Sequence, residues 1–260
     1  MGPMTSRAGA LPLKSVTTNR ASNGFSVKNL KFYLDRGRKE EEISFELWRL
    51  VNAGYTARNQ EGIRKHIEEL KKEGIPAPDS APTAYEVISN LVSFDRTIEV
   101  VGEKTSGEAE YVLLCSGQDV FVGVGSDHTD RELETVSIIK SKQICPNVMS
   151  NRVWDLKEVR KNWDGIMLRS WVKNDQGERV LYQESSLSVM LSPEDLMEFI
   201  RKKMDDDGRL DGVMIFSGTV PVLAKRPNYN DYFEVELFCP KLRKRLGCSY
   251  EVNVLRYLSG

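Results

Sequence analysis

Short runs of β-branched and apolar residues recur from Tyr85 to about residue 140, and they limit the choice of fold more than any other feature. Ile98–Val101, Tyr111–Leu114 and Val120–Val124 are separated by Gly, Ser and Asp, which is typical of short strands joined by tight turns. Similar runs continue in the C-terminal half, at Met167–Val172, Val180–Gln183, Met214–Phe216 and Phe233–Phe238. The sequence therefore predicts an α+β or mostly-β enzyme domain.

Two segments carry helix signals. Asn59 is a suitable N-cap for an apolar stripe that ends before Gly74, and Ser192 followed by Pro193 predicts the start of a second helix. Two other segments are less determined. Residues 43–51 fit a strand or a short helix, and residues 154–163 fit a short helix.

Composition limits the class of protein. The chain has 260 residues, of which 40% are hydrophobic, and its formal net charge is -1. One substantial core can form, and no overall field attracts the chain to nucleic acid or to an acidic membrane. The four cysteines include no C-x-x-C pair, which favours free thiols in a reducing compartment. With no membrane-length apolar run and no signal-peptide pattern, we expect a cytoplasmic protein.

Composition also changes along the chain. Residues 1–42 are rich in Ser, Thr, Asn, Gly and Lys, which predicts a flexible N-terminal arm. We expect residues 43–260 to form a single catalytic domain, in which residues 43–95 form a small N-terminal subdomain or a lid.

Two carboxylates stand two residues apart at the start of a predicted strand. Because side chains at i and i+2 share a face of a strand, Glu108 and Glu110 are expected to point the same way. Without a cation, their mutual repulsion forces one of them towards protonation. A hard divalent cation with oxygen ligands removes this repulsion. The alternative is a solvated strand edge, which an isolated E-x-E pattern also fits.

Further motifs follow in a fixed order. They are Ala53-Gly54-Tyr55-Thr56-Ala57-Arg58 and His66, then Glu108 and Glu110, Asp127-His128-Thr129-Asp130-Arg131-Glu132-Leu133, Lys142 before Pro146, Gln183, and Gly218-Thr219-Val220-Pro221. This order resembles the fumarylacetoacetate hydrolase superfamily. The whole chain is most similar to a domain-of-unknown-function branch of it. One departure is the extra residue before Pro221 in the Gly-Thr-Pro turn.

The resemblance implies a fold and a set of ligands. The fold is a β-rich roll like the C-terminal domain of fumarylacetoacetate hydrolase, with a few peripheral helices. Mg²⁺ or Mn²⁺ is expected at Glu108, Glu110 and Asp127. The expected substrate is a keto acid or 1,3-dicarbonyl compound, and the expected assembly is a homodimer. Lys142 is expected to stabilise developing negative charge. The residues expected to bind substrate are Arg58, Arg131, Gln183, Gly218 and Thr219.

The two histidines are the candidate bases. His66 is one helical turn from Glu69, which could fix its tautomer; the alternative is a packing or surface histidine. His128 follows a predicted ligand, and because strand neighbours point oppositely its ring is expected to face away from the metal. Arg131 has an alternative role too, as a structural ion-pair partner of Glu132 or Glu134.

These expectations lead to an enzyme that acts through a metal-bound enolate, with hydrolysis of a C–C bond as the leading reaction. Hydrolysis requires an activated water, and the histidine–glutamate motif that serves this purpose in the superfamily's hydrolases has no evident match here. Decarboxylation, tautomerisation and dehydration on the same scaffold are therefore alternatives. An alternative of another class is a non-catalytic dimeric scaffold, which has no need for four converging charged groups.

Overall fold

The strand that follows the E-x-E motif is buried on both faces. In the computed structural model, β8 (Ala109–Ser116) forms a hairpin with β9 (Asp119–Asp127) through a turn at Gly117. Tyr111 and Leu113 face one hydrophobic core, and Val112 and Leu114 face a second. Burial on both faces explains why this segment is continuously apolar instead of alternating. The structure describes residues 27–37, 39–72, 78, 80–205, 207–224, 228–256 and 258, without the side chains of residues 66 and 69–71.

The hairpin lies at the centre of a ten-stranded, curled sheet. In spatial order its strands are β2 (Glu40–Leu47), β1 (Lys28–Asp35), β12 (Arg152–Asp155), β9, β8, β15 (Val213–Phe216), β3 (Arg49–Gly54) and β4 (Thr83–Val87), with β11 (Asn147–Met149) pairing with β9 and β5 (Val92–Ser93). The curl brings Phe32 and Phe45 into one cluster with Leu114 and Phe216. This cluster is the second core.

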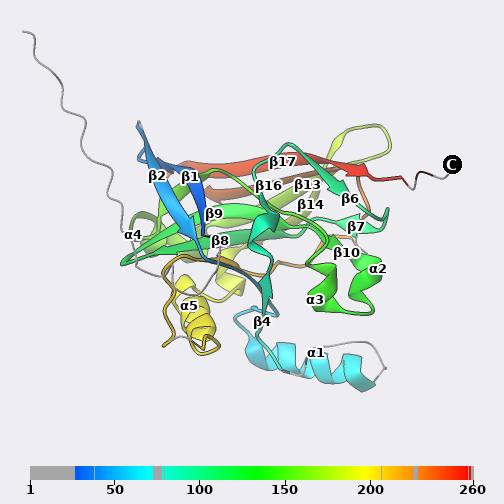
Figure 1. Cartoon of the computed structure of the whole chain (residues 1–260), viewed down its shortest axis with the longest axis horizontal. Coiled ribbons are helices and arrows are strands. Elements are labelled where there is room, and N and C mark those ends of the chain that lie inside the picture. The colour runs from blue at the N-terminus through cyan, green and yellow to red at the C-terminus, as the bar shows by residue number, and fades with distance from the viewer. Residues whose placement is uncertain are drawn as a thin grey trace, which may run out of the picture.

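A five-stranded sheet packs on the other face of the hairpin. Its order is β14 (Arg179–Ser186), β13 (Met167–Lys173), β16 (Tyr232–Cys239), β17 (Lys244–Val254) and β6 (Thr97–Val100). Leu168, Leu237 and Tyr250 meet Tyr111 and Val124 between the two sheets. A short pair, β7 (Thr105–Ser106) with β10 (Thr129–Asp130), continues beyond the hairpin's open end. Figure 1 shows β17 and β16 running alongside β9 and β8.

Helices lie at the periphery. The α-helices are α1 (Gln60–Lys72), α2 (Arg131–Glu134), α3 (Ile138–Ser141), α4 (Leu156–Val159) and α5 (Pro193–Arg201). The 3-10 helices are η2 (Ser89–Leu91), η3 (Arg160–Gly165) and η4 (Leu187–Val189). In Figure 1, α1 lies at the end of the molecule opposite β17, and α2 and α3 lie beside β10. No helix in the described ranges is long and apolar enough to cross a membrane.

Most sequence-predicted elements are confirmed. A sheet-rich mixed fold is observed. The side chain of Asn59 accepts the amide of Gly62, and that of Ser192 accepts the amide of Asp195, so both predicted N-caps are confirmed. The Asn174–Gly177 loop joins β13 to β14 as a hairpin. Residues 43–51 contain the end of β2 and the start of β3, which resolves the choice between helix and strand.

Two predictions need correction. The arm predicted over residues 1–42 is wrong from residue 28 onwards, because β1 and β2 pair with each other and β1 pairs with β12; residues 1–26 lie outside the described part. The short helix predicted over 154–163 is a strand end, one turn of α-helix and a 3-10 helix, since Trp154 pairs with Val122.

The close approach of β11 to β9 depends on Gly125. A Cβ added there would stand 2.6 Å from the Val148 carbonyl oxygen and 2.9 Å from Phe216 Cε1. We predict that Gly125→Ala lowers the free energy of unfolding by about 1–3 kcal/mol or more, because a backbone atom cannot move aside as a side chain can. Urea unfolding measures this loss. The control is Gly165→Ala, where a Cβ meets nothing within 4 Å; equal effects at both positions would contradict the packing account.

Candidate metal centre

The register of the β8–β9 hairpin brings three carboxylates together. Glu110 is the second residue of β8 and lies opposite Gly125. The amide of Asp127 donates to the Glu108 carbonyl at 3.2 Å, so the ladder continues for one further pair. Because the side-chain period of a strand is two, Glu108, Glu110 and Asp127 share a face. One oxygen from each lies within 4.8 Å of the others. The spacing of Glu108 and Glu110 predicted their shared face, and the family resemblance implied Asp127 as the third member.

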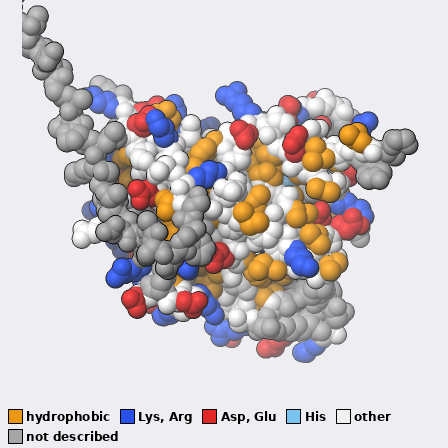
Figure 2. All heavy atoms as spheres, viewed as in Figure 1, with side chains coloured by type: hydrophobic (Ala, Val, Ile, Leu, Met, Phe, Trp, Pro, Cys, Tyr) orange, Lys and Arg blue, Asp and Glu red, His pale blue; other side chains and the backbone are white. Residues whose placement is uncertain are grey.

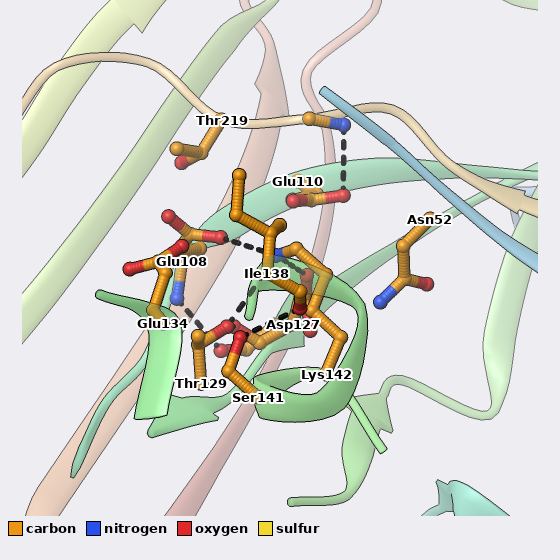
Figure 3. A network of polar contacts seen from close by, with 12 residues as sticks. Asn52, Glu108, Glu110, Asp127, Thr129, Glu134, Ile138, Ser141, Lys142 and Thr219 are labelled. Atoms are coloured by element: carbon orange, nitrogen blue, oxygen red, sulfur yellow. Dashed lines mark hydrogen bonds and ion pairs between the residues drawn. The ribbon is translucent and has the colours of Figure 1, made fainter. Parts of the chain in front are cut away.

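Lys142 reaches this group from the end of α3. Its Nζ donates to Glu108 Oε2 at 3.3 Å and makes a short contact with Asp127 Oδ2. Figure 3 shows the lysine between these carboxylates. Burial lowers the pKa of Lys142, but the charges of Asp127 and Glu108 outweigh it and raise that pKa above its ordinary value. The side chain is therefore a fixed cation.

Arg131, the first residue of α2, holds Glu108 from the other side. Its Nη1 lies 3.1 Å from Glu108 Oε1 and 2.9 Å from Glu134 Oε2, and its Nε donates to Ser106 Oγ at 2.7 Å. Burial of Glu108 opposes ionisation, but the charges of Arg131 and Lys142 lower its pKa to about 2. Of the two roles considered for Arg131, the structure shows the ion pair to Glu134, together with one to Glu108; substrate binding by Arg131 stays a prediction.

Glu110 and Asp127 are less well compensated. Glu110 Oε2 accepts the amide of Gly218 at 2.9 Å. Burial, followed by the charges of Asp127 and Glu108, raises the pKa of Glu110 well above its ordinary value. Burial also raises the pKa of Asp127, against the charge of Lys142. Asp127 Oδ1 is buried without a hydrogen-bond partner in the described structure, and such an atom is costly unless a ligand satisfies it.

A divalent cation fits this arrangement. Four carboxylates, those of Glu108, Glu110, Asp127 and Glu134, lie among two cations, Lys142 and Arg131, so the formal charge is 2 − 4 = −2. The oxygens of the three converging carboxylates are the ligands that Mg²⁺ and Mn²⁺ prefer. The unpartnered Asp127 Oδ1 supplies one of them. The donor set therefore matches a hard divalent ion.

The turn after β15 is hydrogen-bonded to the strand that carries Glu110. Gln183 Oε1 accepts the amide of Ala109 at 3.1 Å, while its Nε2 donates to Thr219 Oγ1 at 2.8 Å and to the Val220 carbonyl at 2.6 Å. The Thr219 hydroxyl donates to the Ala109 carbonyl at 2.8 Å. Both side chains therefore orient the turn that bears the Gly218 amide, rather than presenting free groups to a ligand.

Gly218 occupies a position where a side chain would not fit. Its φ is +81°, and a Cβ there would lie 2.7 Å from Thr56 Oγ1. The Thr56 hydroxyl donates to the Ser217 carbonyl at 2.6 Å. The Ala-Gly-Tyr-Thr segment thus packs directly on the turn that binds Glu110.

His128 faces away from the carboxylates, as strand alternation predicts. Its Nδ1 lies 2.9 Å from the Tyr250 hydroxyl, and its Nε2 lies 2.9 Å from Thr105 Oγ1. Burial, with a further contribution from Arg131, lowers the pKa of His128 to about 3. Both ring nitrogens are occupied, so the geometry opposes the candidate role of His128 as a base.

Of the remaining predicted site residues, Arg58 does not join the group. Arg58 Nη2 lies 2.7 Å from Asp164 Oδ1, and Arg58 Nε donates to the Met190 carbonyl, so the expected substrate ligand instead ties the start of α1 to η3 and η4. The backbones of His66 and Glu69 are in α1, as predicted. Their side chains lie outside the described residues, and the role of this pair stays a prediction.

Sequence reasoning missed the groups that line the site from β3. Asn52 is buried beside Lys142 and Glu110 in Figure 3, and it accepts from Asn147 Nδ2 at 3.0 Å. Tyr55 has a left-handed φ of 55°, which is uncommon for a residue with a side chain. Burial, then the charges of Tyr85, Glu134 and Glu108, raise its pKa. A polar Asn52 inside an apolar run was the available signal.

Known structures share this fold. The crystal structure of Cg1458 is 18% identical, with a TM-score of 0.56 over 80% of this chain and 76% of that one. A 2-keto-3-deoxy-D-arabinonate dehydratase, also solved with magnesium and 2,5-dioxopentanoate, is 14% identical, with a TM-score of 0.58 over 83% of this chain and 77% of that one. At these identities the likeness shows the fold alone.

The comparison with families covers the site. No curated protein matches the chain. A family model described as "Protein of unknown function (DUF2848)" matches residues 53–250, which include every residue of the carboxylate group and the Ala53–Arg58 segment. Because the match spans more than half of the 260 residues, the chain belongs to the DUF2848 family.

Proposed function

We propose that this protein is a metal-dependent lyase of the fumarylacetoacetate hydrolase superfamily that acts on a hydroxylated 2-keto acid, with dehydration as the favoured reaction. The observation that carries the proposal is the convergence of Glu108, Glu110 and Asp127 on one face, with the fixed cation Lys142 between them. The fold shared with a magnesium-containing keto-acid dehydratase supports it.

Glu108, Glu110 and Asp127 would hold Mg²⁺ or Mn²⁺. When bound, such an ion polarises the keto and carboxylate oxygens of a 2-keto acid and so acidifies the neighbouring carbon. The Lys142 ammonium stabilises negative charge that develops on the keto oxygen as the proton leaves.

Glu134 is the proposed proton acceptor. It is the carboxylate of the cluster that lies outside the converging triad, and 30% of its side chain is exposed. Its Oε2 lies 2.9 Å from Arg131 Nη1, and this ion pair holds the Glu134 carboxylate beside Glu108. Removal of a proton from the carbon next to the keto group starts dehydration and tautomerisation, whereas decarboxylation reaches the same kind of enolate by loss of CO₂. In dehydration, the electron pair of the enolate expels the hydroxyl of the next carbon, and the proton taken up by Glu134 returns to it, so that water leaves.

Hydrolysis, the leading reaction from sequence, has less support than elimination. It needs a base that activates water. Of the two histidines in the chain, His128 has both nitrogens occupied, and the side chain of His66 is outside the described structure. Elimination needs no activated water, and the carboxylate and lysine already in the cluster serve it.

The first prediction of this proposal concerns Glu110→Gln. A carboxyl whose folded pKa is raised binds protons more tightly when folded, so its contribution to stability is lost as pH rises through that pKa. Above that pKa the ionised Glu110 carboxylate destabilises the folded state. A glutamine side chain cannot ionise and so avoids this destabilisation, and its oxygen can still accept the Gly218 amide. After chelation of divalent ions, we expect the variant to melt above the wild type, with a larger difference at pH 8 than at pH 5.

Addition of Mg²⁺ should reverse the order of the two melting temperatures. At 100 times its Kd, Mg²⁺ stabilises the wild type by about 2.7 kcal/mol, a rise of roughly 5–10 °C for a domain of this size. Glu110→Gln should lose this rise. Differential scanning calorimetry with and without Mg²⁺ measures both effects, and an equal Mg²⁺ response in variant and wild type would remove the metal assignment.

A second prediction separates catalysis from metal binding. Pyruvate serves as a minimal 2-keto acid, and exchange of its methyl protons with D₂O, followed by NMR, reports removal of the proton next to the keto group. Lys142→Met should slow exchange about 10²- to 10³-fold, and Glu134→Gln at least about 10²-fold. The rise in melting temperature with Mg²⁺ should persist in both.

The controls lie on the same short helices. Lys140→Met and Glu132→Gln change exposed groups that do not touch the triad, and they should leave exchange unchanged. If the wild type binds Mg²⁺ but produces no exchange above the free metal, the scaffold alternative replaces the enzyme. Full exchange activity in Lys142→Met would make that lysine structural.

A homodimer is also part of the proposal. Figure 2 shows hydrophobic side chains gathered on the face where β6, β10 and α3 lie in Figure 1. Val136, between α2 and α3, is 80% exposed and Ile139 of α3 is 49% exposed. Contiguous exposed apolar groups mark interaction surfaces. We expect light scattering to give a dimer that Val136→Glu with Ile139→Glu dissociates and the control Val180→Glu does not; a monomeric wild type would refute it.

A further inference from the structure

The face of the hairpin opposite the carboxylates carries a buried chain of polar groups. Alternation along β9 directs Ser126 and His128 to the five-stranded sheet, while Asp127 between them points to the metal site. The Tyr250 hydroxyl lies 2.8 Å from Ser126 Oγ and 2.9 Å from His128 Nδ1. His128 Nε2 lies 2.9 Å from Thr105 Oγ1. One tyrosine of β17 therefore binds the residues on either side of Asp127.

The same chain reaches Glu108. Ser126 Oγ accepts the Glu108 amide at 3.1 Å. The residue before it, Gly107, lies against Phe233, since a Cβ there would stand 2.6 Å from Phe233 Cδ1. Phe233 packs on Tyr250 with ring centroids 5.8 Å apart. The backbones of two proposed ligands are thus set by contacts with the second sheet.

The polar groups of this network are buried, and their removal from water costs free energy. Tyr250 is 1% exposed, and Ser126, His128 and Thr105 are almost completely buried. Polar groups in such a place are destabilising unless they are hydrogen-bonded, and an apolar cluster would fill the same volume without that requirement. A fully connected polar network fixes one arrangement of its members. What this network fixes is the end of β9 and the start of β8, where the carboxylates are attached.

We infer that Tyr250 is a positioning residue of the metal centre, which orients Asp127 and Glu108 through Ser126 and His128. The inference rests on the proposed metal site. It also gives His128 a role as a bridge between β17, β9 and β7 in place of proton transfer. Partners of this kind outside the ligand set typically change metal affinity by about 10- to 100-fold when removed.

The test is Mg²⁺ binding by calorimetry to Tyr250→Phe. The variant keeps the ring and its packing, and we expect Kd to rise about 10- to 100-fold. The control is Tyr232→Phe, a tyrosine of the same five-stranded sheet whose hydroxyl donates to Glu234 Oε2 at 3.0 Å. It also loses the hydrogen bond of a tyrosine hydroxyl, but none to the residues beside Glu108 and Asp127, so its Mg²⁺ affinity should stay that of the wild type.

Ser126→Ala breaks the same link from its other end. In a double-mutant cycle with Tyr250→Phe, the losses in Mg²⁺ affinity should be less than additive, because both variants remove one shared interaction. If Tyr250→Phe fails to fold, the comparison of Ser126→Ala with Tyr232→Phe decides. Wild-type affinity in Tyr250→Phe, or additive losses, overturns the inference and leaves the proposed function intact. A wild type that binds neither Mg²⁺ nor Mn²⁺ overturns both.

Discussion

The repulsion among three converging carboxylates, of which Glu110 and Asp127 are buried and Glu108 is half-buried, is the constraint on which the rest of the site depends. A folded chain does not keep such a group without compensating charges or hydrogen bonds. Lys142 and Arg131 provide part of this compensation, and both are placed by the short helices that follow β9 and β10.

The three carboxylates are not equally compensated by positive charge, and this difference is what points to a bound cation. Glu108 receives both cations and stays ionised, whereas Glu110 receives only a backbone amide and retains a raised pKa. If the cluster were purely structural, a third cation or a protonated, fully hydrogen-bonded acid would complete it. Instead, Asp127 Oδ1 is left without a partner. The deficit of two positive charges matches one divalent ion.

The central hairpin and the ligand pattern were predictable from sequence, because both follow from a period of two. Continuous apolar residues predicted β8, and the spacing of Glu108 and Glu110 predicted a shared face. The period also predicted that His128 would turn away. This period could not predict which distant segments cover each face of the hairpin, because β1, β2 and β17 are placed by pairing between residues far apart in the sequence. The sequence around Tyr250 likewise gives no indication that this tyrosine contacts Ser126.

The fate of the predicted substrate ligands shows where specificity must reside. Gln183, Thr219 and Arg131 have their polar groups committed to holding the turn, the strand and Glu108. These groups are therefore not free to bind the reacting end of the proposed 2-keto acid, and discrimination among such substrates would come from residues at the rim of the carboxylate group. The end of β3 borders it, where Tyr55 holds a left-handed backbone beside the Gly218 turn. Strain of this kind persists only where the surrounding structure enforces it, and here Thr56 and Gln60 do so by binding the Ser217 and Tyr55 carbonyls. The segment between β3 and α1 thus fixes the backbone at Tyr55, and burial, followed by the charges of Tyr85, Glu134 and Glu108, raises the pKa of its phenol.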